Sequence, residues 1–246
     1  MLLALFLCVE ARTAAPLMPL RLLGRRSVAS ANAAMLVSGS AMFCMWYFMT
    51  LYAQNALGYT PLEAGLALVP SSVAVLVGSK TAPRLLRRAG TRTVAVTGTL
   101  VAAAGFAWQS TMGPHGAFAT AIMFPGILMM LGAGLAATPL AALATSGAAP
   151  TEAGLLSGLV NTSRTMGGSL GLAVLSTIAA SRTGGDGGAA ALTAGYATAF
   201  RVGTGVLLAG AVLMLLWLPR RPVSAVQESS GAAGNGPGGS GTPSYI

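Results

Sequence analysis

A single arginine lies well inside an apolar stretch of the chain. Arg164 stands in the run Glu152–Ser181, about three helical turns from its start. A charge inside a membrane costs several kcal/mol unless it is paired or hydrated, so Arg164 is a candidate to hold a substrate anion or a partner carboxylate. Alternatively, its long side chain reaches the nearby membrane surface. Asn161, one turn earlier, is either an interhelical hydrogen-bonding residue or a substrate contact.

The same run has two different faces when it is drawn as a helix. Small and polar side chains share one face, and large apolar side chains share the opposite face. The first group comprises Gly154, Ser157, Asn161, Arg164, Gly168 and Gly171, and the second comprises Leu155, Leu159, Met166 and Leu170. We expect the second face to contact lipid, and the first to pack against protein or to line a cavity.

Acidic side chains are few and lie away from the centre of every apolar run. They are Glu10, Glu63, Glu152, Asp186 and Glu228. The only histidine, His115, falls in a loop, so the chain has no obvious group to carry a proton through a membrane. The segment Ser38-Gly39-Ser40 could belong to an intramembrane serine protease, but that chemistry needs a buried histidine base. We therefore expect no enzyme, no cofactor and no metal site.

The composition predicts an all-α integral membrane protein. Hydrophobic residues make up 54% of the chain and charged residues 8%, and the mean hydropathy is +0.72. A soluble domain carries roughly a quarter charged residues. The net charge of +9 indicates basic loops retained on the cytoplasmic side rather than nucleic-acid binding. Cys8 and Cys44 both lie in apolar runs, so we expect no disulfide.

Six apolar runs are long enough to span a membrane or nearly so. We predict helices at Val28–Ala53, Leu62–Ser79, Thr93–Met112, Phe118–Thr145, Glu152–Ser181 and Ala199–Leu218. Pro70, Pro125 and Pro139 predict bends. Basic residues gather before the first run, between the second and third, and after the sixth, so both termini are expected in the cytoplasm of a cell-membrane protein. Five aromatic residues near the outer end of the first run predict an interfacial belt, namely Phe43, Trp46, Tyr47, Phe48 and Tyr52.

The flanking segments differ from the six-helix region 28–218. Residues 1–9 resemble the end of a preceding transmembrane or linker helix, and residues 10–27 form a basic cytoplasmic linker. Residues 219–246 are rich in Gly, Ser and Pro and are expected to be a disordered cytoplasmic tail.

A short sequence recurs at the start of two predicted helices. Glu63-Ala64-Gly65-Leu66 follows Thr60-Pro61, and Glu152-Ala153-Gly154-Leu155 follows Thr151. In both, a threonine precedes an acid in the first turn, which is typical of a helix N-terminus. The two helices are three apart and run in opposite directions, as in a 3+3 inverted repeat within a six-helix half.

Several stretches resemble the C-terminal half of a major facilitator superfamily transporter of the fourteen-span drug:proton antiporter type. They are Pro16–Leu23, Thr50–Ala67, the glycine-then-basic loop Gly78–Arg92 and Glu152–Ala173. The resemblance covers nearly all of residues 9–221 and implies that a full-length protein exports hydrophobic or cationic, antibiotic-like drugs in exchange for protons, with the missing half supplying the proton carrier. The alternative is a truncated, non-transporting six-helix protein that assembles only with a partner half or as a homodimer.

The resemblance also suggests site residues. In that family the first and fourth helices of each half line the central cavity, so the candidates for contact with a small-molecule substrate are Trp46, Tyr47, Thr50, Gln54, Thr138, Asn161 and Arg164. The loop corresponding to the cytoplasmic gate holds Gly78, Arg84, Arg87, Arg88, Gly90 and Arg92. The family pattern usually has an aspartate where Arg87 stands, so these basic residues either act at the gate or only fix the topology.

Overall fold

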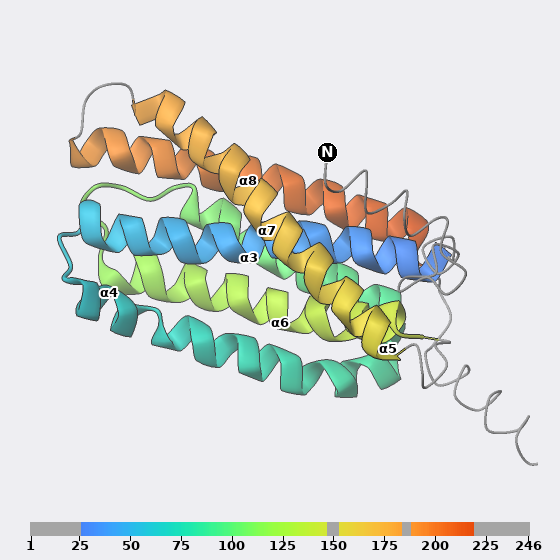
Figure 1. The fold of residues 1–246 in the computed structure, drawn as a ribbon. Helices are drawn as coiled ribbons and strands as arrows, with labels where there is room; N and C mark the ends of the chain where they lie inside the picture. The colour runs from blue at the N-terminus through green and yellow to red at the C-terminus, as the bar shows by residue number, and fades with distance from the viewer. Residues whose placement is uncertain (1–25, 147–152, 184–187, 219–246) are drawn as a thin grey trace, which may run out of the picture.

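The computed structural model describes residues 26–146, 153–183 and 188–218, and all regular secondary structure in these ranges is helical (Figure 1). The predicted helix remnant at residues 1–9, nearly all of the basic linker and the predicted tail lie outside the described residues. The elements are α3 (Arg26–Asn55), α4 (Pro61–Ala67), α5 (Val69–Gln109), the π-helix η1 (Ala119–Met123), α6 (Phe124–Ala144), α7 (Ala153–Thr183) and α8 (Ala189–Trp217).

The chain reverses its direction inside α5 at a single glycine. Gly90 has φ 77° and ψ 163°, a backbone conformation that glycine adopts readily because it has no Cβ. The prediction of a loop spanning Gly78–Arg92 is therefore wrong, because the helix continues to the residue before Gly90 and resumes directly after it. The first arm of α5 (residues 69–89) and the second arm (residues 91–109) correspond to the second and third predicted helices.

Both arms of α5 pack on α6, in opposite directions. In the first arm, Ser71 meets Gly126 and Val75 meets Gly134, so this arm is parallel to α6. In the second arm, Gly98 meets Ala136 and Gly105 meets the backbone of Met129 and Pro125, so this arm is antiparallel to α6. The helices lie side by side along one common direction, with α7 crossing α3 obliquely (Figure 1). Small residues let the backbones approach closely, as is typical of membrane helix bundles.

Proline interrupts the helices close to where bends were predicted. The segment predicted as Leu62–Ser79 is divided at Leu68, between α4 and α5, and Pro70 occupies the first turn of α5. Pro125 occupies the first turn of α6 and follows the π-helical turn η1. A proline has no amide hydrogen to donate, so it is tolerated in a first turn. Pro139 lies inside α6, which is continuous through it.

The start of α4 has the predicted capping arrangement. The backbone amide of Thr60 donates to Glu63 Oε2 at 2.8 Å, and the backbone amide of Glu63 donates to Thr60 Oγ1 at 3.3 Å. This reciprocal pair is a capping box. The second copy of the motif begins at residues 150–152, outside the described residues.

Four helical segments in the described part of the chain are long and apolar enough to cross a membrane. They are Ser27–Asn55, Pro61–Gln109, Ala119–Ala144 and Ala189–Trp217, the second of which contains the reversal at Gly90. The last begins ten residues before the predicted start, Ala199. The fold is thus an all-helical membrane bundle in the residues described, and α7 is the one long helix of this part of the chain that is not among these four segments.

The interior of the bundle is built from alanine, methionine and aromatic side chains. Phe48 and Tyr52 of α3 are buried, and Phe48 packs on Tyr196 and Phe200 of α8 with ring centroids 5.8 and 6.1 Å apart. The prediction of an interfacial belt is therefore wrong for Phe48 and Tyr52, which belong to the core. Phe43 and Tyr47 are exposed, in accord with a position on the bundle's outer surface.

Candidate functional site

The seam between α3 and α7 is the closest helix contact that involves α7. The Cα of Gly167 lies against the carbonyl of Leu36, and Gly39 lies against the carbonyl of Arg164. Neither glycine could carry a Cβ without displacing backbone, so the two helices are held at minimal separation by glycine on each side. This seam fixes the rotation of α7 about its axis and therefore decides which of its side chains remain accessible.

A polar bond that the sequence reasoning missed lies within this seam. Ser163 Oγ donates to Asn32 Oδ1 at 3.0 Å, and Asn32 Nδ2 donates to the carbonyl of Val28 at 2.9 Å. Asn32 is buried. A buried amide in a membrane helix needs such partners, so an Asn in an apolar run was a usable signal in the sequence.

The side chains of Asn161 and Arg164 extend from α7 away from the bundle and are exposed. Arg164 Nη2 donates to Asn161 Oδ1 at 3.0 Å, and both side chains are exposed. Asn161 was predicted to be either an interhelical hydrogen-bonding residue or a substrate contact. In the structure its amide oxygen is bonded within its own helix, and the interhelical bond is made instead by Ser163.

A shallow groove runs along this exposed face. It is lined by Asn161, Thr162, Thr165, Met166, Ser169 and Leu170. The hydroxyls of Thr165 and Ser169 donate to carbonyls of their own helix, so their oxygen lone pairs remain free to accept. The groove therefore offers hydrogen-bond acceptors, the amide of Asn161 and two large apolar side chains, and Arg164 is bonded to Asn161 outside the groove lining.

The predicted division of α7 into two faces is partly wrong. Leu155 and Leu159, predicted to face lipid, pack with Val28 of α3 and with buried Leu156. Gly154 and Ser157 are exposed, so they do not pack within the bundle, and their alternative role in lining a cavity stays a prediction. Met166 and Leu170 are 50% and 55% exposed, as expected of an outward face. The rotation of α7 about its own axis is therefore set by its closest backbone contact, at Gly167, and not by the positions of its most polar residues.

Apart from Tyr47, the cavity candidates on α3 and α6 are less exposed than those on α7. Trp46 and Gln54 are half-buried, and Tyr47 is 43% exposed and makes an edge contact with Phe48 at 5.3 Å between centroids. The hydroxyl of Thr50 donates to the carbonyl of Trp46 at 2.7 Å. Thr138 is half-buried on α6. The groove on α7 includes Asn161 of the predicted set and none of these α3 and α6 residues.

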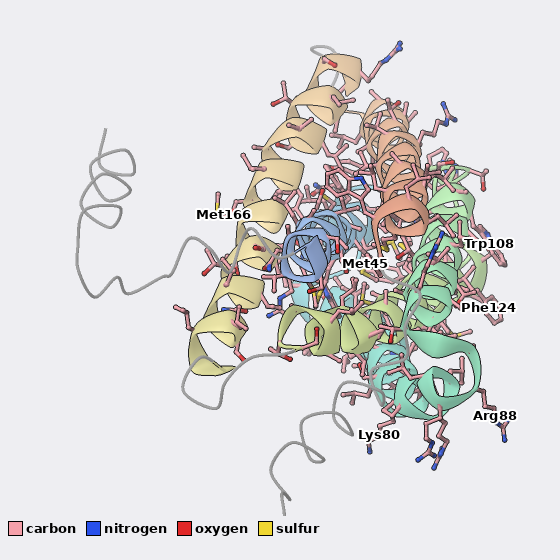
Figure 2. All side chains as sticks on the ribbon, turned by 90° about the vertical axis from the view of Figure 1, so that its right-hand side faces the viewer. Met45, Lys80, Arg88, Trp108, Phe124 and Met166 are labelled. Carbon is pink, nitrogen blue, oxygen red and sulfur yellow. The ribbon has the colours of Figure 1, made fainter. Side chains whose placement is uncertain are left out.

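The residues predicted for the gate have three different roles in the structure. One glycine packs against a neighbouring helix, another forms a turn, and the basic residues lie mostly on the surface. Gly78 lies against the backbone of Leu131 and Gly134, so it serves helix packing. Gly90 forms the reversal of α5. The side chains of Lys80, Arg84, Arg87 and Arg88 are exposed and Arg92 is half-buried. Figure 2 shows Lys80 and Arg88 pointing away from the bundle.

Two further buried polar residues were not foreseen. Gln109 Nε2, at the end of α5, donates to the carbonyl of Ala121 in the π-helix η1 at 2.9 Å. Tyr52 Oη donates to the carbonyl of Gly113 at 2.7 Å and so anchors the segment between α5 and η1 to α3. Within the described ranges, no three His, Cys, Asp or Glu side chains come close enough to hold a metal ion.

Comparisons with known proteins agree in the family they indicate. Residues 9–172 match the model of the Major Facilitator Superfamily. The chain is 43% identical over 216 residues, or 87% of its length, to the cephamycin export protein CmcT of Amycolatopsis lactamdurans. It is 32% identical over 242 residues, or 94% of its length, to the puromycin resistance protein pur8 of Streptomyces alboniger. The matches cover 44% and 48% of those two proteins, so the chain spans about half the length of the curated relatives that it matches.

Proposed function

Since the chain belongs to the major facilitator superfamily and is a multi-pass membrane protein, we propose that it forms one six-helix half of a drug-efflux transporter. Its six passes are α3, the α4 segment with the first arm of α5, the second arm, η1 with α6, α7, and α8. In this proposal they form a 3+3 inverted repeat in the C-terminal half of a fourteen-span protein, with both termini in the cytoplasm.

The observation that carries the proposal is the exposed polar face of α7. Asn161, Arg164 and Thr165 are exposed on the outside of the bundle, in the first half of α7. Polar and charged groups are expensive against hydrocarbon and are usually found facing protein or a water-filled cavity. A second bundle placed against this face would enclose a polar path between the two halves, which is where transporters built from repeats bind their substrates.

In this arrangement the wall of the path is built from a few residues with distinct tasks. Arg164, held by Asn161, offers a positive charge and hydrogen-bond donors to an anionic group of the substrate. Tyr47 offers an exposed ring for stacking or for a cationic group. Met166 and Leu170 give adaptable apolar contacts.

The substrate in this proposal is a small antibiotic-like molecule. Relatives are named for cephamycin export, for puromycin resistance and, in Mycobacterium tuberculosis, for multidrug resistance. The last, named Stp, is 31% identical over 177 residues, which is 72% of the chain and 33% of the relative. Because the one acid in the described ranges, Glu63, lies at the start of α4, the proton-carrying group of an antiporter would come from the other half.

The second candidate function is a bundle that does not transport and only assembles with a partner. In this alternative, the exposed face of α7 is the contact surface for that partner. A homodimer would place two copies of the α7 face against each other, with two Arg164 side chains meeting. Like charges in such a contact repel each other, which disfavours this arrangement unless anions neutralise them.

The test compares the chain alone with the chain joined to the part of the cephamycin export protein that it does not span. Cephamycin accumulation is measured in cells that express either form or an empty vector. We expect the joined protein to lower accumulation severalfold and the chain alone to have no effect. Equal export by the chain alone would contradict the half-transporter proposal, and no export by the joined protein would favour the assembly-only alternative.

The role of Arg164 is tested in the joined protein. Arg164→Ala should raise accumulation severalfold, since it removes the positive charge from the path. The matched control is Arg182→Ala, which removes an exposed arginine from the last turn of the same helix and should leave export unchanged. Unchanged export by the Arg164 variant at normal expression would show that this arginine only reaches the membrane surface.

A further inference from the structure

One exposed stripe runs along α4 and the first arm of α5 and changes in character along its length. Its first part is apolar and 46–74% exposed, comprising Leu62, Leu66, Val69, Val73, Leu76 and Val77. Its second part is basic and exposed, comprising Lys80, Arg84, Arg87 and Arg88. Most successive members are three or four residues apart, so the basic side chains continue the same helix face as the apolar ones.

We propose that this stripe binds an anionic phospholipid, with its headgroup on Lys80, Arg84, Arg87 and Arg88 and its acyl chains along Val69–Val77. The inference concerns the lipid surroundings of the bundle and does not depend on whether the chain transports a drug. It assigns to the basic cluster a ligand in addition to its expected part in membrane topology.

The dimensions of the stripe suit one lipid leaflet. Lys80 lies eleven residues after Val69 in α5, which corresponds to about 16 Å at the rise of an α-helix. The hydrocarbon of one leaflet is about 15 Å thick, half of a bilayer core. A headgroup bound at Lys80 would therefore place its acyl chains beside Leu76, Val73 and Val69.

The charge of the cluster selects the kind of headgroup. Four exposed cations occupy nine residues of helix, from Lys80 to Arg88. The one acid in the described ranges, Glu63, lies near the far end of the stripe, where it is bonded to Thr60. Arginine donates several hydrogen bonds in a planar arrangement that matches phosphate oxygens. Lys80 and Arg88 lie in the part of the first arm that leads to Gly90, and Figure 2 shows their charged ends directed away from the bundle.

The experiment measures which lipids the purified 246-residue chain retains in nanodiscs of equal parts phosphatidylglycerol and phosphatidylcholine. After transfer to detergent, the retained lipids are counted by native mass spectrometry. We expect phosphatidylglycerol to be enriched about tenfold or more, since each basic residue near an anionic surface strengthens binding by a factor of about five. The enrichment should fall in 0.5 M NaCl as charges are screened.

The matched variants separate this cluster from basic residues in general. K80Q/R84Q/R87Q/R88Q should abolish the enrichment, whereas R182Q/R201Q, which removes two exposed arginines elsewhere, should preserve it. Should the quadruple variant fail to fold, Arg87→Gln alone should reduce the enrichment by about fivefold.

Several outcomes would overturn the proposal. If the quadruple variant retained the wild-type enrichment, the basic cluster would serve only to set the membrane topology. Topology is fixed when the protein is inserted, so it has no influence on which lipids the purified protein retains. Equal retention of both lipids by the wild type would indicate that the stripe contacts protein. Complete displacement of phosphatidylglycerol by 10 mM inorganic phosphate would reduce the site to a phosphate site without acyl contacts.

Discussion

Helices α6 and α7 both contain several glycines. In α6 the glycines contact neighbouring helices on two faces, whereas in α7 they contact a neighbouring helix on one face only. In α6, Gly132 lies against the second arm of α5, at Gly98 and Ala102, and Gly134 lies against the first arm, at Val75. In α7, Gly167 and Gly171 lie against α3, whereas a Cβ at Gly154 or Gly158 would meet nothing within 4 Å. Glycine therefore surrounds α6 with backbone, while it holds α7 by one side only.

The difference has a consequence for what each helix can do. Apart from Phe124, no residue of α6 is exposed, and α6 lies between the two arms of α5. The free side of α7 carries polar groups and a groove. A helix packed on all sides contributes stability, and a helix packed on one side retains a face for a partner or a ligand.

The largest effect should come from filling the contact of Gly132. Gly132→Val places a branched side chain against the backbone of Ala102 and Gly98, where neither helix can yield without separating. We expect a loss of about 3 kcal/mol in the free energy of unfolding, at the upper end of overpacking costs. Denaturant unfolding in detergent measures it. Gly158→Ala in α7 is the control, with an expected change within about 0.5 kcal/mol. Equal stability of the two variants would contradict the contrast between the helices.

A smaller effect is expected from the α3–α7 seam. Gly167→Val forces the carbonyl of Leu36 away, while α7 keeps its contact with α8, where Gly195 lies against the carbonyl of Ala179. We expect about 2 kcal/mol, and the damage should be confined to α7. Hydrogen exchange should therefore accelerate in α7 while protection in α6 is unchanged. Gly154→Val, at an open position of the same helix, controls for the branched side chain. Uniform acceleration throughout the chain would show that the seam supports the whole bundle.

How far the sequence predicted this contrast depends on the kind of signal. Hydropathy and charge located the helices, because a run of about twenty apolar residues favours a membrane-spanning helix whatever the rest of the chain does. The reversal at Gly90 was placed inside a longer predicted loop, since basic residues are equally compatible with the last turns of a helix and with a loop. The capping box was predicted from Thr60 and Glu63, and these residues form it, because the bonds span only three residues.

The site was harder to predict than the helices. The exposure of Asn161 and Arg164 follows from the rotation of α7, which is fixed by the contact of Gly167 with Leu36. That contact joins residues distant in the sequence, and no periodic pattern within α7 reveals it. For the same reason, the sequence suggested Asn161 as an interhelical hydrogen-bonding residue, and it did not indicate that Ser163 bonds to Asn32.

The hydrogen bond from Ser163 to Asn32 should contribute less than either glycine contact. Polar bonds between membrane helices average about 0.6 kcal/mol in double-mutant cycles. We expect a coupling energy of about this size between Ser163 and Asn32. It is measured from the free energies of unfolding of Ser163→Ala, Asn32→Ala and the double variant. The control is Ser176→Ala, whose hydroxyl donates only to Ala173 of its own helix. A coupling energy near zero would leave the seam to glycine packing alone.

The smallest effect on stability should come from the free face of α7, and it tests the contrast most directly. Thr165→Leu and Ser169→Leu replace exposed side chains whose hydroxyls donate only within α7. We expect the free energy of unfolding of this chain to change by less than about 0.5 kcal/mol, as for most surface substitutions. In the joined transporter the same changes should weaken cephamycin export, because they remove acceptors from the proposed path. Met166→Leu, an apolar exchange in the same groove, should not. If both Leu variants instead stabilised the chain and left export intact, the free face of α7 would contact lipid, and its polar residues would no longer distinguish it functionally from α6.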